Sequence, residues 1–186
     1  MTIRLLCEKD IPAVLEIYRP YIETSVVTFE YEAPSLLEFT KRVHAIQQEF
    51  PWLVCEIGGE VIGYAYASHY HDRAAYFWDC ELSVYVKQGV RRQGVGTALY
   101  QALLPLLKAQ GYYQAYAVIA APNPQSQLFH QKLGFRSLGI HPKVGFKFGE
   151  WRDLDFQVLE LREKNQPAPF PVPFPKLEAV DRETVL

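Results

Sequence analysis

Cysteine is scarce in this sequence of 186 residues, which contains only Cys7, Cys55 and Cys80. The three are far apart, and no two of them form a CxxC pair. An odd and scattered set of this kind excludes a disulfide framework and a cysteine zinc site. We therefore expect reduced thiols in a cytoplasmic protein, and the first residues show no pattern of a signal peptide.

Long apolar runs and an excess of positive charge are missing as well. No apolar run reaches the roughly 18 residues that a membrane-spanning helix needs, so we expect no membrane partner. Lysine and arginine number 19 against 21 aspartate and glutamate residues, which gives a formal net charge of -2. This balance argues against a general nucleic-acid binder, which usually has a strong basic excess.

What remains is the composition of an ordinary folded domain, with 49% hydrophobic and 22% charged residues. Strand and helix patterns alternate, which predicts a mixed α/β domain with one central sheet. Within the third helix, Pro105 is expected to cause a kink near residues 101–105. The expected strands cover residues 2–6, 52–57, 61–68, 76–86, 112–119, 135–140, 143–148 and 151–161, and the expected helices cover residues 10–22, 35–48, 94–110 and 123–133.

The composition changes near the end of the chain. We divide it into a domain over residues 1–164 and a C-terminal tail over residues 165–186, because residues 166–175 alternate with proline. Such a segment is extended and solvated, or it lies over a surface. A solubilising tail is the simpler interpretation, and a ligand for a proline-recognising partner is the alternative.

One segment carries the pattern of a binding site. A predicted strand over residues 82–86 is followed by a glycine-containing turn and a new helix. Gly94 and Gly96 allow close approach of a ligand to the backbone, and the helix N-terminus points free N–H groups at the same place. This combination binds phosphate, although a tight turn without ligand explains a glycine pair equally well. The Gly-Lys-Ser/Thr ending of a Walker phosphate-binding loop is missing, and so is the third glycine of a Rossmann dinucleotide-binding motif.

These residues resemble a known family. Arg91-x-x-Gly94-x-Gly96 after the strand is similar to the acetyl-CoA pyrophosphate loop of the GNAT superfamily of N-acetyltransferases. Residues 123–135, with Asn123, Ser126 and His130, resemble the second helix of that superfamily that contacts coenzyme A. The phosphinothricin and methionine sulfoximine/sulfone acetyltransferases are the branch that the chain resembles over residues 2–162. Supporting segments are residues 21–25, 51–54, 81–86, 117–119 and 145–153.

The resemblance implies the GNAT acyl-CoA N-acyltransferase fold, a mostly antiparallel central sheet flanked by helices. It also implies acetyl-CoA as cosubstrate, no metal, a homodimer and a small-molecule amine as acceptor. Strand residues 84–86 would supply an oxyanion donor and pair with the pantetheine amides. The implied cofactor-binding residues are Val84, Tyr85, Val86, Arg91, Arg92, Gln93, Gly94, Val95, Gly96, Thr97, Asn123 and Ser126.

Two side chains are the catalytic candidates. Glu81 matches the proposed general base of the family, which must take a proton from an amine that is largely protonated at neutral pH. The alternative for Glu81 is an ordinary strand carboxylate that pairs with a cation. His130 stands where many relatives have tyrosine, and three roles remain open for it: orienting Glu81, relaying a proton, or serving as acid.

The resemblance places three residues beside the acceptor. Arg73 suits a carboxylate or phosphinate because its planar guanidinium makes two parallel hydrogen bonds, and a solvated loop arginine is the alternative. Phe29 and Tyr76 are the other two, and either fits a core position equally well. Asp79 adds a carboxylate near Glu81 and favours a cationic acceptor instead. The hairpin around residues 147–151 is expected near the active site and the dimer interface.

Two further patterns are weaker. His69, His71 and Asp72 contain metal-ligand types, but no fourth ligand is evident, and a solvated turn is the better interpretation. Cys80 with His130 suggests a nucleophile. Strand alternation, however, places Cys80 and Glu81 on opposite faces, so we expect a buried thiol.

The sequence therefore predicts an acetyl-CoA-dependent N-acetyltransferase that acts on the α-amino group of a small amino-acid-like acceptor. The reaction would be a direct attack with Glu81 as the base. Two alternatives stay open. One is acetylation of another amine, such as a polyamine, an antibiotic or a protein N-terminus, and the other is a non-catalytic module that binds coenzyme A.

Overall fold

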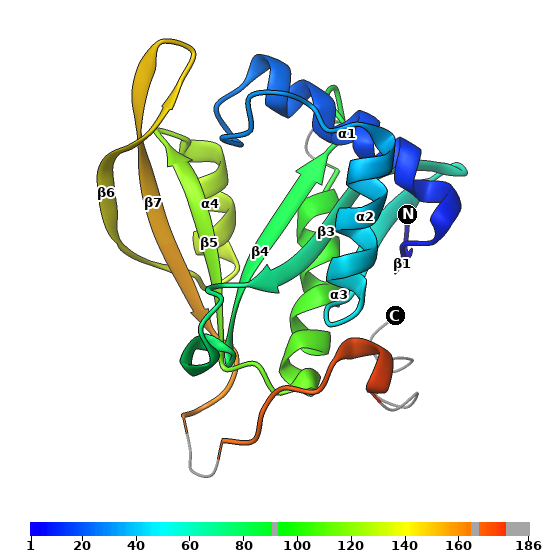
Figure 1. Cartoon of the computed structure of the whole chain (residues 1–186), viewed down its shortest axis with the longest axis vertical. Helices are drawn as coiled ribbons and strands as arrows, with labels where there is room; N and C mark the ends of the chain where they lie inside the picture. The colour runs from blue at the N-terminus through cyan, green and yellow to red at the C-terminus, as the bar shows by residue number, and fades with distance from the viewer. Residues whose placement is uncertain (91–92, 165–167, 178–186) are drawn as a thin grey trace.

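The computed structural model describes residues 1–90, 93–164 and 168–177. Seven strands form one sheet in the order β1-β2-β3-β4-β5-β7-β6, and every neighbouring pair is antiparallel except β4 and β5 (Figure 1). The strands are β1 Thr2–Leu5, β2 Trp52–Ile57, β3 Glu60–His69, β4 Asp79–Val86, β5 Gln114–Ala121, β6 Arg136–Lys147 and β7 Glu150–Glu160. The expected mixed sheet is confirmed.

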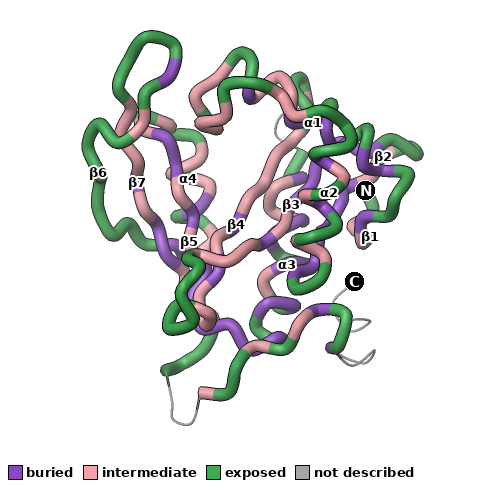
Figure 2. Tube along the Cα trace, viewed as in Figure 1, coloured by how far each residue is buried: buried purple, intermediate pink, exposed green. Residues whose placement is uncertain are grey.

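In the part of the chain that the structure describes, four α-helices cover the two faces of the sheet. They are α1 Ile11–Thr24, α2 Leu36–Gln47, α3 Val95–Gln110 and α4 Pro124–Lys132, and short 3-10 turns lie at Glu8–Asp10, Ala74–Tyr76 and Phe174–Lys176. The apolar side chains of α1 and α2 pack on Trp52, Val54 and Tyr64. The apolar side chains of α3 pack on the alternate strand residues, such as Leu53 and Ala65. Successive strand residues thus serve two separate cores. Figure 2 shows buried and intermediate residues along the central strands.

Local sequence explains where the helices begin and end. Ser35 caps α2 through its hydroxyl and forms a capping box with Glu38. Gly94 precedes α3 with φ of 74°, and Gly111 ends that helix with φ of 103°. The third expected helix is therefore confirmed. It continues through Pro105 as one element, so the expected kink does not divide it.

The hairpin at the β6 edge differs from the expected pattern. The two strands expected over residues 135–140 and 143–148 are a single strand, because register shifts absorb the irregular residues around Pro142. Proline is tolerated there since β6 is an edge strand. Phe148 and Gly149 form the turn, both with positive φ, one residue earlier than the expected Gly149-Glu150 turn.

The expected start of the strand before Glu81 was wrong, whereas one of the two alternatives for the C-terminal segment, lying over a surface, is confirmed for residues 168–177. The strand expected from residue 76 begins only at Asp79, and Tyr76 belongs to a 3-10 turn. Residues 168–177 are laid over the surface at the end of α3, and Phe174 and Leu177 are buried in the core beneath α3.

Within the described residues, no helix is long and apolar enough to cross a membrane.

Candidate active site

The central strands β4 and β5 separate part of the way along their length. Their parallel pairing runs from Asp79 and ends where Glu81 meets Tyr116. Beyond this point β4 stays paired with β3 as far as Val86, and β5 stays paired with β7 as far as Ala121. The sheet is therefore split immediately after Glu81.

The split leaves part of the β4 backbone without a neighbouring strand. The Lys87 amide donates to the Ile62 carbonyl of β3 at 2.8 Å. Hydrogen-bonding direction alternates along an antiparallel strand, so Leu82 and Val84 point their backbone groups away from β3. The Leu82 amide is used in the last parallel pairing with β5, at Tyr116, which leaves the Leu82 carbonyl and the amide and carbonyl of Val84 facing the split. These groups are suited to hydrogen-bond an extended ligand that takes the place of a strand.

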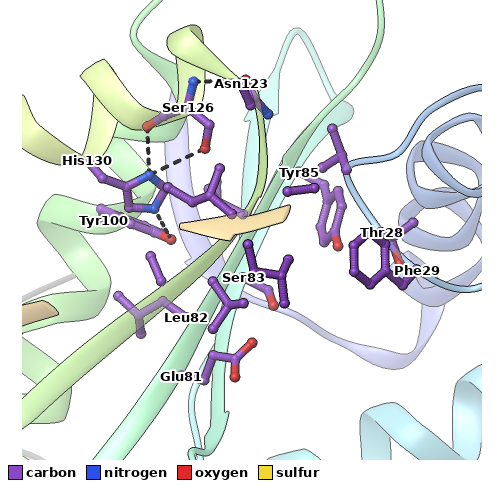
Figure 3. Close-up of a pocket in the computed structure, with 17 residues that line it drawn as sticks. Thr28, Phe29, Glu81, Leu82, Ser83, Tyr85, Tyr100, Asn123, Ser126 and His130 are labelled. Atoms are coloured by element: carbon purple, nitrogen blue, oxygen red, sulfur yellow. Dashed lines mark hydrogen bonds between the residues drawn. The ribbon is translucent and has the colours of Figure 1, made fainter. Parts of the chain in front are cut away.

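A cavity of about 240 Å³ lies at this split and is lined from both faces of the sheet (Figure 3). On one face its wall is the loop after α1, with Thr28 and Phe29. On the other face its wall is formed by α3 and α4, with Tyr100, Ser126 and His130. The remaining lining residues are Val27, Glu81, Leu82, Ser83, Val84, Tyr85, Ala117, Val118, Ile119, Ala120, Asn123 and Leu154.

Glu81 is the acidic residue of this cavity. Its side chain is half-buried, and burial raises the pKa of its carboxyl above the ordinary value. Within the described ranges it makes no ion pair, so those residues do not support the alternative of a carboxylate held by a cation. Cys80 is fully buried on the opposite side of the strand, so the expected buried thiol is confirmed, and burial raises the pKa of this thiol.

His130 is buried and hydrogen-bonded through both ring nitrogens. Its Nδ1 lies 2.9 Å from the Ser126 carbonyl, which only accepts, so Nδ1 carries the proton. Its Nε2 then accepts from the Tyr100 hydroxyl at 3.2 Å (Figure 3). Burial lowers the pKa of His130, and the ring is therefore neutral at pH 7. No direct hydrogen bond joins His130 to Glu81 among the described residues.

The turn before α3 is the segment where phosphate binding is expected. Gly94 adopts a positive φ, and among the described residues no side chain caps the helix that starts at Val95. Gly96 has a different role, because a Cβ there would lie 3.3 Å from the Phe129 ring of α4. It therefore permits the close packing of two helices. Gln93 is exposed beside this turn with Thr97 in the first helical turn, whereas Arg91 and Arg92 lie outside the described residues.

Asn123 begins α4 and lines the cavity. Its side-chain oxygen accepts from the Ser126 amide at 3.1 Å, which caps the helix. The side-chain amide nitrogen of Asn123 is the group left for a ligand. The predicted Asn123 and Ser126 are thus brought together at the α4 end of the cavity with His130.

The three residues predicted for the acceptor are not all brought together. Phe29 lines the cavity, while Arg73 and Tyr76 are exposed on the β3–β4 loop and do not line it. Tyr70 of the same loop stacks on Tyr116, with ring centroids 4.0 Å apart, at the position where Glu81 pairs. The loop therefore borders the site without entering the cavity.

The β6–β7 hairpin holds Phe29 in place. The ring of Phe29 occupies the space above Gly145, where a Cβ would lie 2.1 Å from it. Lys147 is buried and donates to the carbonyls of Ile22 and Thr28, each at 2.8 Å. The Tyr31 hydroxyl also donates to a carbonyl of the hairpin. The cavity wall around Phe29 is thus fixed by β6, which agrees with the expectation that this hairpin lies near the site.

Several cavity residues were absent from the sequence prediction. Tyr100 sits at a core-facing position of α3, so its periodicity indicated packing only. Thr28 and Ser83 gave no motif, although Ser83 is two residues after Glu81 and shares its face by alternation. No group of three or more metal-ligating side chains occurs among residues 1–90, 93–164 and 168–177.

A sheet split at a carboxylate, beside a helix N-terminus without a side-chain cap in the described residues, fits the acyl-CoA N-acyltransferase fold that the sequence resembles. The comparisons with known proteins agree. The acetyltransferase (GNAT) domain family matches residues 3–155. The chain therefore belongs to the GNAT acetyltransferase family, and it is an acetyltransferase.

Its relatives include the branch that the sequence resembles. The chain is 39% identical to phosphinothricin N-acetyltransferase of Streptomyces viridochromogenes, over 90% of the chain and 91% of that protein. It is 34% identical to L-methionine sulfoximine/L-methionine sulfone acetyltransferase of Pseudomonas aeruginosa, over 82% of the chain and 90% of that protein. A solved phosphinothricin acetyltransferase of Sinorhizobium meliloti in complex with acetyl-CoA has a TM-score of 0.84 and 34% identity, covering 91% of this chain and 97% of that one.

Proposed function

We propose that this protein transfers an acetyl group from acetyl-CoA to the α-amino group of a small amino-acid-like acceptor. Phosphinothricin, methionine sulfoximine and methionine sulfone represent the acceptor type, because relatives with these names match most of the chain. The observation that carries the proposal is the cavity at the β4–β5 split. It reaches both faces of the sheet and contains Glu81 without a cation partner in the described residues.

The residues on the α3–α4 face fit acetyl-CoA. The uncapped N-terminus of α3 suits the pyrophosphate, since its free amides and partial positive charge favour an anion. The backbone carbonyls of Leu82 and Val84, which face the split, suit the amides of the pantetheine arm, with the Asn123 side-chain amide nearby. When bound there, acetyl-CoA supplies the thioester that the amine attacks. We also assign Arg91 and Arg92 to the pyrophosphate, as the resemblance implies.

Glu81 acts as the general base in this proposal. An α-amino group with a pKa of about 8 is mostly protonated at pH 7 and cannot attack until it loses a proton. The raised pKa of Glu81 makes its carboxylate a stronger base than an exposed one, directly or through a water molecule. The amide of Val84 points into the split and is the donor that we assign to the developing oxyanion.

We assign His130 to the orientation of Tyr100. The Nδ1 proton is fixed on the Ser126 carbonyl, which leaves Nε2 as an acceptor that holds the Tyr100 hydroxyl at the cavity wall. A neutral ring in this tautomer does not donate a proton to Glu81. This supports a role that the sequence did not predict, the orientation of Tyr100, over the three roles that the sequence left open, which were orienting Glu81, relaying a proton and serving as acid.

The acceptor enters from the α1–α2 face in this proposal. Phe29 forms the wall opposite Glu81, and the exposed Arg73 on the bordering loop binds the carboxylate or phosphinate of the acceptor, next to Tyr76. Within the described ranges Arg73 has no ion-pair partner, so its guanidinium is available. Asp79, half-buried on the same face as Glu81, favours a second candidate, a cationic amine such as a polyamine.

The release of free coenzyme A thiol from acetyl-CoA tests the proposed function. The acceptors are phosphinothricin, methionine sulfoximine, methionine sulfone, spermidine and a short peptide, each measured with the wild type and with Glu81→Gln. Saturable release with the first three that is lost in the variant supports an amino-acid acetyltransferase. Release with spermidine or the peptide alone supports the second candidate. Absence of release despite bound acetyl-CoA contradicts both and favours a non-catalytic module.

We further propose that the protein is a homodimer that associates through the β6–β7 hairpin. This edge of the sheet exposes large apolar side chains, which is unusual for a monomer surface. Figure 2 shows β6 as an exposed segment along most of its length. The exposed side chains are Leu138, Ile140, Val144, Phe146, Phe148 and Trp151. Light scattering after size exclusion should give twice the monomer mass, and Trp151→Glu should lower it. A monomeric wild type at micromolar concentration would contradict this assignment.

A further inference from the structure

The C-terminal strap, residues 168–177, lies across one end of the molecule (Figure 1). Its far half is anchored firmly. Phe174 and Leu177 are only 6% and 5% exposed and pack in the core beneath α3. The backbone of Val172 exchanges hydrogen bonds with Gln110, a buried residue at the end of α3. The strap is therefore held at a fixed position relative to the sheet.

The near half of the strap contacts the residue that precedes β4. The indole N–H of Trp78 donates to the Pro169 carbonyl at 2.8 Å. The ring of Phe170 stacks on the same indole, with centroids 4.7 Å apart and planes 20° apart. Phe170 is otherwise 62% exposed, so its contact with Trp78 is not explained by burial in the core. The strap thus holds Trp78 by a hydrogen bond and a ring stacking contact, and Trp78 is three residues before Glu81.

The other end of the β3–β4 loop is held through the same anchor. The Phe174 amide and the Gln110 side chain both donate to the Glu49 carbonyl. The carboxylate of Glu49 lies 2.8 Å from His69, the last residue of β3. The His69 ring in turn packs on Phe77, with centroids 4.9 Å apart. Both ends of the loop over residues 70–78 are therefore linked to the strap. Trp78 contacts the strap directly, and His69, just before the loop, contacts Glu49, whose backbone is bound by the strap.

We propose that the strap is a positioning element for the acceptor side of the site, with Phe170 and Trp78 as its positioning residues. The loop whose ends it holds carries Arg73 and Tyr76 and borders Glu81. The cofactor side, at the N-terminus of α3 and at α4, lies away from these contacts. Loss of the Phe170 stacking should therefore weaken acceptor binding and leave acetyl-CoA binding unchanged. The inference rests on the proposed acceptor chemistry.

Three variants of the full chain test this role. Phe170→Ala removes the stacking, Phe170→Tyr keeps an aromatic ring, and Val172→Ala removes an exposed strap side chain while the backbone contacts remain. For Phe170→Ala we expect the KM for methionine sulfone or phosphinothricin to rise between about twofold and tenfold, the range that one aromatic pair provides. The KM for acetyl-CoA should stay at the wild-type value, and Phe170→Tyr and Val172→Ala should behave as the wild type for both substrates.

Hydrogen–deuterium exchange provides a readout that does not depend on turnover. In Phe170→Ala, the amides of residues 70–78 should exchange faster, while those of α3 and α4 should not change. Equal rises in both KM values, or unchanged exchange in this loop, would overturn the positioning role. A wild type that turns over none of these acceptors would instead contradict the proposed function, and the exchange result would still decide whether the strap orders the loop.

Discussion

The imidazole of His130 shows how the surroundings of one side chain set its chemistry. Burial opposes its positive form and outweighs the hydrogen bond to the Ser126 carbonyl, which acts to raise the pKa. In the neutral ring, the two hydrogen bonds to Ser126 and Tyr100 select the tautomer with the proton on Nδ1. We therefore expect an NMR titration of this ring to give a midpoint below the ordinary histidine value of about 6.5. Because the folded-state pKa is lowered, this histidine opposes folding as the pH falls below that value.

Tyr100→Phe is the matched variant for this measurement. It removes the donor to Nε2 and keeps the ring volume of a fully buried side chain. The titration midpoint should remain low, because burial is the main cause, whereas the Nε2 chemical shift should change. A His130 midpoint above 7 in the wild type would show that the ring is charged at neutral pH, against the tautomer assigned here.

Individual site residues differ in how well the sequence predicts them. Phe29, Glu81, Val84 and His130 were predicted, and the structure places all four around one cavity. Tyr100 could not be predicted, because a buried tyrosine at helical spacing gives the same pattern as a packing residue. Its contact with His130 depends on the packing of α3 against α4, which no local pattern specifies.

At the scale of elements, the β6–β7 hairpin and the loop after α1 form one unit of the site. Gly145 leaves room for the Phe29 ring, and an added Cβ would overlap it. Gly145→Ala should therefore displace Phe29 from the cavity wall and lower kcat/KM for the acceptor by roughly tenfold or more, since small misplacements are costly in catalysis. Steady-state kinetics with both substrates varied measures this effect.

Arg136→Ala is the control on the same strand. Its side chain is exposed at the opposite end of β6, and its contact with Glu160 is long at 3.8 Å. Acceptor kinetics should be unchanged in this variant. A wild-type kcat/KM in Gly145→Ala would mean that Phe29 is not held by the hairpin in the working enzyme.

The elements themselves were largely predictable. Periodicity located all four helices, with α1 continuing two residues farther than expected, to Thr24. The prediction was wrong for β6, because a proline in an apolar stretch normally ends a strand, while an edge strand can accommodate it in a register shift. The strap contacts were also beyond prediction, since a proline-rich sequence gives no information on what it packs against.

At the scale of the whole molecule, an ion cluster links the N-terminal strand to α1 and β2. Arg4 donates to both oxygens of buried Asp10, at 2.6 and 2.9 Å, and also to Glu56. These hydrogen bonds hold the pKa of Asp10 well below its ordinary value. Asp10→Asn should therefore lower the free energy of unfolding at pH 7 by about 2 to 3 kcal/mol.

The pH dependence of this cluster has a definite sign. A carboxyl with a lowered pKa stabilises the fold above its ordinary pKa of about 3.9 and loses that contribution as the pH falls. The difference between the wild type and Asp10→Asn should thus shrink below about pH 4 in denaturant titrations. Glu16→Gln removes an exposed pair with Arg19 and should change stability by less than about 0.5 kcal/mol. Equal effects of the two variants at pH 7 would contradict the assigned role of the cluster.

The split between β4 and β5 is the central feature of the molecule, because it opens at Glu81, the residue that is proposed to act as the base. The pH dependence of kcat/KM for the acceptor, in the wild type and in Glu81→Gln, tests that claim most directly. The wild-type profile should fall with a slope of one below the acceptor amine pKa, and with a slope of two below a second pKa that lies above the ordinary glutamate value of about 4.3. Glu81→Gln should be slower by about 10²- to 10⁴-fold and keep only the amine limb. A variant with the wild-type rate and both limbs would contradict the account.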